Sequence, residues 1–255
     1  MGTEKQAGHA VDPEGKWMYR VGGICALVLG IAYLITIALY AHVGAPPSSG
    51  KAWLTYLAGK TTEWWAILGL SVFTDLLYVP VAFALYLALQ GIARSAMLVA
   101  TACVGLFVVL DLAVTWTNYA SLIMLSGTYA AASTGAQRMA DIAAANYASA
   151  VLASRLETVY AIVILSCGIL LISLVMLKGL FNKMTAAVGL ITGVLGIVSI
   201  AGWAVTIILN AVFATLWLLL VGYRLYRLSQ QQFTSALERE GTSPRSPLRQ
   251  AGAEH

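Results

Sequence analysis

Long apolar runs separated by short polar breaks dominate the chain. Such runs cover residues 19–41, 64–90, 95–125 and 156–177. A helix needs roughly 20 apolar residues to cross a bilayer, so each run predicts one membrane-spanning helix. The last run, 184–223, carries no charge and is about twice as long as one crossing requires, so it predicts two more spans.

The breaks between the runs contain turn-forming residues. Pro46 and Pro47 end the first helix, and residues 91–94 predict a tight turn between the second and third spans. We expect the last run to fold back near Gly202. Segment 126–154 is rich in alanine and less apolar than its neighbours, which indicates a loop and a helix outside the membrane.

These elements predict an all-α fold, a polytopic membrane helix bundle with about six transmembrane helices. The bundle should occupy residues 17–228, and the first span should be retained because it is too long for a signal-peptide core. The polar ends, 1–16 and 229–255, are expected to be disordered. The composition agrees, since 60% of the 255 residues are hydrophobic and only 10% are charged. The mean hydropathy is +0.81, so the lipid bilayer is the expected solvent.

Basic residues predict the orientation of the bundle in a cell membrane. Eleven of the fifteen lysines and arginines fall on the side that holds both termini, and four fall on the other side. The richer side should be cytoplasmic, which puts both termini there. Because these charges flank apolar runs, the net charge of +4 is no sign of nucleic-acid binding.

Five tryptophans should lie at the outer interface as an ordinary aromatic belt: Trp53, Trp64, Trp65, Trp116 and Trp203.

Two carboxyl groups lie inside predicted spans, Asp75 in the second and Asp111 in the third. An aspartate at the centre of a membrane helix costs roughly 2.5–3.5 kcal/mol on insertion scales. Residue 93, in the predicted turn, is midway between them in sequence. The two aspartates are therefore expected at equal depth on adjacent antiparallel helices, in the outer half of the membrane.

Further polar residues share the helix faces of these aspartates. Arg155 is the basic residue expected near enough to pair with one of them, which leaves a second carboxyl that is protonated or holds a cation. The predicted pocket consists of Asp75, Asp111, Arg155, Tyr78, Thr115, Asn118, Glu157 and Tyr160. Tyr33, Thr36 and Tyr40 share one face of the first span and either line the same pocket or belong to the core.

The favoured interpretation is a protein that binds or moves a small solute, a cation or a proton through this pocket. No catalytic residue, metal ligand or cofactor is predicted. The first alternative is an intramembrane enzyme that uses Asp75 and Asp111 as acid and base. The second is a membrane scaffold or sensor, in which protonated aspartates only link helices. The sequence contains no mid-span lysine, H-E-x-x-H motif or P-loop, which argues against retinal proteins, zinc proteases and nucleotide hydrolases.

Several diffuse motifs resemble the prokaryotic domain-of-unknown-function family 4386 of six-span membrane proteins. The resemblance covers about residues 19–228 and implies six spans, but it implies no site residues. Its motifs are Arg20 with Gly22-Gly23, Ala84-Leu85-Tyr86, Gly168-Ile169-Leu170-Leu171 and Gly189.

Overall fold

The computed structural model describes residues 15–179 and 181–241, and side chains from 17 to 179 and from 181 to 230. All regular structure in these residues is helical, as the apolar runs predict. The elements are α1 (Gly15–Val43), α2 (Gly50–Tyr56), α3 (Thr61–Leu110), the π-helix η1 (Asp111–Trp116), α4 (Thr117–Ala131), α5 (Gly135–Leu152), α6 (Arg155–Thr158), the π-helix η2 (Val159–Val163), α7 (Ile164–Met176), α8 (Lys183–Val198), the 3-10 turn η3 (Ser199–Ala201) and α9 (Ala204–Gly241).

Five segments of the described chain are long and apolar enough to cross a membrane: Trp17–Val43, Thr61–Ala131, Arg155–Met176, Lys183–Ala201 and Ala204–Gln230. Large apolar side chains point outward from them, including Val109 (62% exposed) and Ile208 (62% exposed). Exposed aliphatic side chains along long helices are expected where lipid replaces water around the protein. The helices are those of a membrane-embedded protein.

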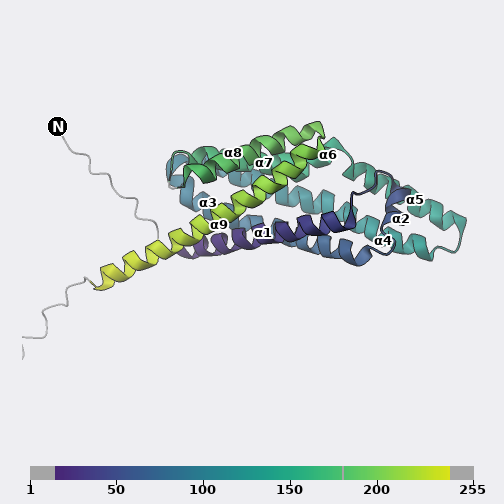
Figure 1. Ribbon diagram of the computed structural model, residues 1–255, viewed down its shortest axis with the longest axis horizontal. Coiled ribbons are helices and arrows are strands. Elements are labelled where there is room, and N and C mark those ends of the chain that lie inside the picture. The colour runs from purple at the N-terminus through teal and green to yellow at the C-terminus, as the bar shows by residue number, and fades with distance from the viewer. Residues whose placement is uncertain (1–14, 180, 242–255) are drawn as a thin grey trace, which may run out of the picture.

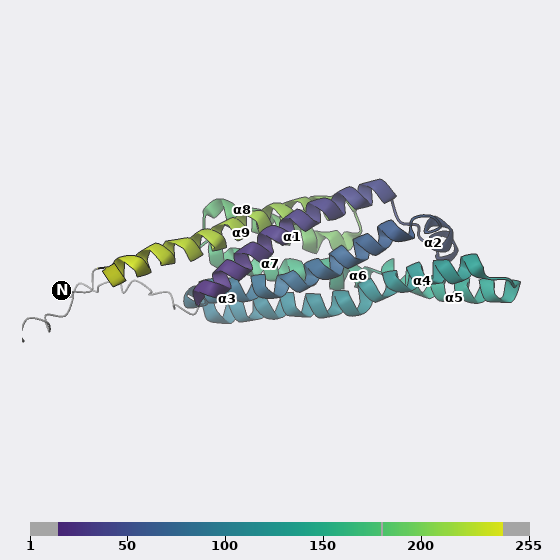
Figure 2. The same ribbon diagram turned by 90° about the horizontal axis from the view of Figure 1, so that it is seen from below.

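The second segment, of 71 residues, reverses direction at Ala93. The backbone there leaves the helical region, with φ −154° and ψ 77°. The two halves then pack side by side (Figure 2), and the rings of Tyr78 and Phe107 are 5.5 Å apart. This confirms the turn predicted at 91–94. The predicted reversal near Gly202 is also confirmed, since Gly202 has φ +81° between η3 and α9.

Helices α1 and α9 touch closely at one end and diverge toward the other (Figure 1). A Cβ atom on Gly23 would lie 2.8 Å from the backbone nitrogen of Tyr226, so glycine is needed for the crossing. The closest approach continues as far as Gly30, which faces Leu219. Beyond this point the two helices separate, and their divergence leaves room for a cavity.

A small helical cap extends the bundle at the end opposite the start of α1 and the end of α9 (Figure 1). It consists of α2, α5 and the adjoining ends of α3 and α4, around a core that includes Trp53, Trp64 and Leu122. Asn146 of α5 accepts a 3.1 Å hydrogen bond from the Gly50 backbone at the start of α2. The helix predicted within 126–154 corresponds to α5.

The interfacial belt assigned to the tryptophans needs correction. Trp53 and Trp64 are 3% and 1% exposed, and their rings pack 5.2 Å apart in the cap core. Trp65 and Trp203 are exposed, as a belt requires. Folding of α2 and α5 over the end of the bundle buries the first pair, and hydropathy alone gives no sign of that packing.

Helix α9 also differs from expectation at its C-terminal end. It continues to Gly241, so the backbone is helical well past the predicted boundary at 228. The added stretch, 229–241, contains three glutamines and two glutamates, which favour helix. The disorder expected for 1–14 and 242–255 lies outside the described residues.

Candidate functional site

The two membrane aspartates lie together in the interior of the bundle. Asp75 is 3% exposed and Asp111 is 4% exposed, and their carboxyl groups are within hydrogen-bonding reach of each other. Trp116 donates a hydrogen bond of 2.7 Å from Nε1 to Asp75 Oδ2. No described lysine, arginine or histidine forms an ion pair with either carboxyl. The pair is therefore a buried carboxyl site without a counter-charge from the described side chains.

The π-helix η1 determines which residues reach this site. Asp111 is its first residue and Trp116 its last. A π-helix bonds i to i+5, so its turn is wider than that of an α-helix and brings residues five apart onto one face. For this reason Trp116 reaches Asp75, although in a regular α-helix a residue five positions after Asp111 would not lie on the same face as Asp111. The shift also moves Asn118 away, and its amide bonds the Val114 carbonyl of its own helix at 2.7 Å.

Two polar atoms at the site lack hydrogen-bond partners. Asp111 Oδ1 and Thr115 Oγ1 are both buried and make no hydrogen bond of good geometry in the described part of the chain. A buried polar group without a partner costs about 1–3 kcal/mol. Orphaned groups next to two carboxyls indicate that the site takes up something further, such as a proton, an ion or a water molecule.

Glu157 adds a third carboxyl at the edge of the site. It is half-buried and close enough to interact with Asp111 and Thr115. Its position follows from the start of α6, where Ser154 caps the helix by accepting a 3.1 Å hydrogen bond from the Glu157 backbone. The second π-helix, η2, begins two residues later at Val159. Both irregular helices thus flank the carboxyls, as π-bulges often do at functional sites.

Arg155 does not take the role expected of it. Its side chain is exposed and forms no ion pair with the described residues. Because Arg155 begins α6 at the end of its segment, its long side chain can reach water and remain hydrated there. Tyr160 is half-buried but makes no hydrogen bond or ring contact with the described side chains.

Tyrosines lie on the side of the carboxyl pair that faces α1. The hydroxyls of Tyr33 and Tyr78 are 3.0 Å apart and hydrogen-bonded. Both rings are close enough to interact electrostatically with Asp75 and Asp111. Tyr78 was predicted for the pocket, and Tyr33 was a candidate because it shares a face of α1 with Thr36 and Tyr40. On the side toward the cap, Tyr119 stacks on Trp64 with 5.4 Å between ring centres.

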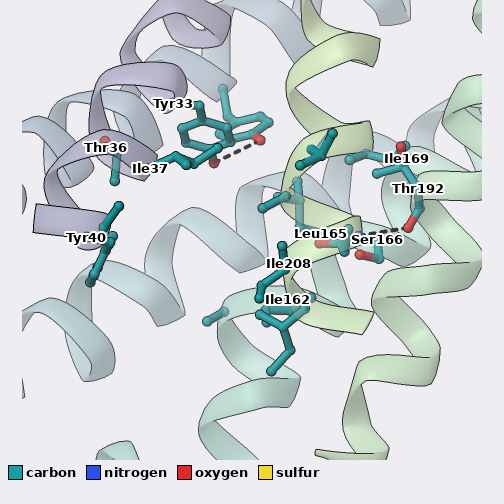
Figure 3. A pocket seen from close by; sticks show the side chains of 18 residues that line it. Tyr33, Thr36, Ile37, Tyr40, Ile162, Leu165, Ser166, Ile169, Thr192 and Ile208 are labelled. Carbon is teal, nitrogen blue, oxygen red and sulfur yellow. Dashed lines mark hydrogen bonds between the residues drawn. The ribbon is translucent and has the colours of Figure 1, made fainter. Parts of the chain in front are cut away.

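Beyond the tyrosine pair is a cavity of about 610 Å³ (Figure 3). Its walls come from α1, α3, η2, α7, α8 and α9. Figure 3 shows Tyr33 and Tyr40 on one side and Leu165, Ser166 and Thr192 on the other. Tyr33, Thr36, Tyr40 and Tyr78 were candidates from the sequence, but the aliphatic part of the lining, from α1, η2, α7 and α9, was missed because it matches ordinary core. Among the described residues, no group of three or more His, Cys, Asp or Glu is arranged to hold a metal ion.

No protein-family model, curated protein or solved structure matches the chain. The resemblance to family 4386 is thereby neither supported nor opposed, and it stays a prediction. Arguments about function therefore depend on the geometry of the site.

Proposed function

We propose that this chain is a six-span protein of a cell membrane with both termini in the cytoplasm. The reversal at Ala93 divides the 71-residue segment into two antiparallel helices of membrane length, which supports six crossings. The start of α1, the turn at Ala93 and the loop before α8 lie at the end opposite the cap (Figure 1). That end carries the larger share of basic residues, including Arg20, Arg94 and Lys183.

Within this topology, we propose that the carboxyl pair binds a proton in the outer half of the membrane. The observation that carries the proposal is the close approach of Asp75 and Asp111 in a buried place where no described residue is a basic partner. Two ionised carboxylates at such a separation repel strongly where the dielectric constant is low. A proton held between them removes one charge and supplies the donor that Asp111 Oδ1 lacks.

The surroundings of the pair support proton exchange with the outer side. Glu157, at the start of α6, is half-buried and close enough to interact with Asp111 and Thr115. It therefore bridges the pair and the exposed segment at Arg155. A small cation is the alternative occupant of the same site, since it would also offset the excess negative charge. The scaffold hypothesis requires instead that the pair only links helices and never exchanges its proton.

Infrared difference spectroscopy tests the proton directly. The protein in nanodiscs at neutral pH is expected to show the C=O stretch of a protonated carboxyl group, and Asp75→Asn and Asp111→Asn should each remove or shift it. Asp141→Asn is the matched control, because Asp141 lies in the cap and accepts a hydrogen bond from Thr128. A spectrum with no protonated carboxyl at neutral pH would overturn the proposal. A band that does not respond to pH or deuterium exchange would favour the scaffold.

The close carboxyl pair also keeps the enzyme alternative open. A pair that shares one proton has the arrangement that acid–base catalysis by two aspartates requires. The distinguishing result is hydrolysis of a membrane-embedded peptide or lipid that both asparagine variants abolish. Proton binding without turnover would leave the first proposal as it stands.

A further inference from the structure

The cavity has exposed lining residues on both α1 and α9, where the two helices diverge. Its mouth is formed where the two helices diverge, by Ile37 and Ala41 of α1 and by Ile207, Ile208 and Val212 of α9. These side chains are exposed, and Ile208 is 62% exposed. Since α1 and α9 are membrane-length apolar helices, the medium outside this mouth is the hydrocarbon of the lipid.

The lining of the cavity carries no charged side chain. Most of it is aliphatic, and apart from Thr36 and Tyr40 of α1 the polar side chains fall in two small sets. One is the hydrogen-bonded pair Tyr33 and Tyr78. The other comprises Ser166, Thr192 and Asn210, where the Asn210 amide donates a 2.8 Å hydrogen bond to the Thr192 carbonyl. A charged ligand would lose its hydration here without gaining a partner, so the lining selects a neutral one.

Hydrogen-bonding capacity remains at both sets. Two phenol hydroxyls carry two protons, and their mutual bond uses one, so a donor is left for a third group. Ser166 Oγ makes no hydrogen bond with the described residues, although the side chain is 2% exposed. A volume of about 610 Å³ lies within the roughly 300–1,000 Å³ of small-molecule sites.

We propose that this cavity binds a neutral amphipathic molecule that enters from the bilayer between α1 and α9. The ligand has an aliphatic body and a hydroxyl or carbonyl head, which hydrogen-bonds to the tyrosine pair or to Ser166. This site is separate from the carboxyl pair, and the proposal does not depend on proton binding. The two sites share a wall, because Tyr33 and Tyr78 lie between the cavity and Asp75.

Photolabelling with a diazirine-bearing dodecanol tests the site in the full-length protein in nanodiscs. We expect labelled peptides from α1 around Ile37 and from α9 around Ile208. Unlabelled dodecanol should compete about tenfold better than dodecane, which corresponds to one hydrogen bond worth about 1.4 kcal/mol. Dodecyltrimethylammonium should compete poorly because its charge would be desolvated.

Substitutions separate the cavity from general lipid contact. Ala211→Phe fills the cavity and should reduce labelling about tenfold. Val205→Phe is the control, because Val205 is on the same helix, is 66% exposed and lies outside the lining. The pair of substitutions Tyr33→Phe with Tyr78→Phe, and separately Ser166→Ala, keep the cavity open. One of these two changes should abolish the advantage of dodecanol over dodecane, so they serve as the second test if Ala211→Phe does not fold.

Three outcomes would overturn the proposal. Labelling spread evenly over lipid-facing helices, and unchanged by Ala211→Phe, would mean that the cavity holds no specific ligand. If dodecane competed as well as dodecanol, the polar groups of the cavity would have no role in binding. If the ammonium compound competed as well as dodecanol, the ligand would not have to be neutral. None of these results bears on the infrared band of the carboxyl pair, so the two proposals fail independently.

Discussion

Trp116 donates its indole hydrogen bond to Asp75 across the two antiparallel helices that meet at Ala93, with 2.7 Å between Nε1 and Oδ2. The bond joins residues 41 positions apart and engages one carboxyl oxygen of Asp75. It thereby restricts the orientation of the carboxyl group that approaches Asp111. The same tryptophan ring packs 5.5 Å from that of Tyr119, so the carboxyl pair is held against the aromatic cluster that leads into the cap.

Trp116→Phe should lower the free energy of unfolding by about 1–3 kcal/mol, because Asp75 Oδ2 loses its donor while it stays buried. Unfolding in detergent micelles, followed by circular dichroism, measures the loss. Trp203→Phe is the matched control, since Trp203 is 65% exposed, and we expect a change below about 0.5 kcal/mol there. Equal effects of the two substitutions would show that the hydrogen bond contributes nothing beyond ring packing.

The approach of Asp75 to Asp111 could be predicted from the sequence because it follows from simple geometry. Residues equidistant from a helical turn lie at the same depth, and the turn was readable from 91–94. The positions of most apolar helices could be predicted for the same kind of reason. A bilayer fixes the length of a crossing helix, so hydropathy alone locates most boundaries.

Three features could not be predicted, and each depends on packing rather than on the periodicity of apolar and polar residues along the chain. The π-helix that begins at Asp111 places Trp116 at the site, whereas α-helical spacing had selected Asn118. The cap buries Trp53 through contacts between distant segments. The third feature is the exposure of Arg155, which was expected to pair with an aspartate, whereas Glu157, two positions later, comes close to them as predicted.

The crossing of α1 and α9 should be sensitive to one methyl group. In Gly23→Ala, the new Cβ would lie 2.8 Å from the Tyr226 backbone nitrogen and 3.1 Å from the Gly222 carbonyl oxygen. Backbone atoms cannot rotate away, so the helices must separate, at a cost of about 1–3 kcal/mol. Gly69→Ala is the control, because nothing lies within 4 Å of its added Cβ, and alanine should stabilise that helix by about 0.5–1 kcal/mol. Thermal unfolding of both variants checks the contrast in sign.

Single-cysteine labelling in sealed cells should reveal the proposed topology. The native Cys25, Cys103 and Cys167 are first replaced, and cysteine is then introduced at exposed positions. Ser48→Cys and Thr134→Cys, at the cap end, should react with an impermeant maleimide from outside. Ser95→Cys, just after the turn at Ala93, should react only after the membrane is opened. Labelling of Ser95→Cys from outside would reverse the assignment of inside and outside.

A double-mutant cycle can measure the direct interaction of the two aspartates. If the two carboxyls share one proton, as proposed, Asp75→Asn and Asp111→Asn each remove the same interaction. The sum of the two single effects counts that interaction twice. The double variant should therefore be less unstable than the sum, by a coupling energy of about 0.5–3 kcal/mol.

The cycle of Asp75→Asn with Asp141→Asn is the control, because Asp141 lies in the cap and shares no partner with Asp75, and its effects should add within about 0.5 kcal/mol. If the two cycles are equally additive, the carboxyls are neighbours without a common proton, and the proton-binding proposal loses its energetic basis.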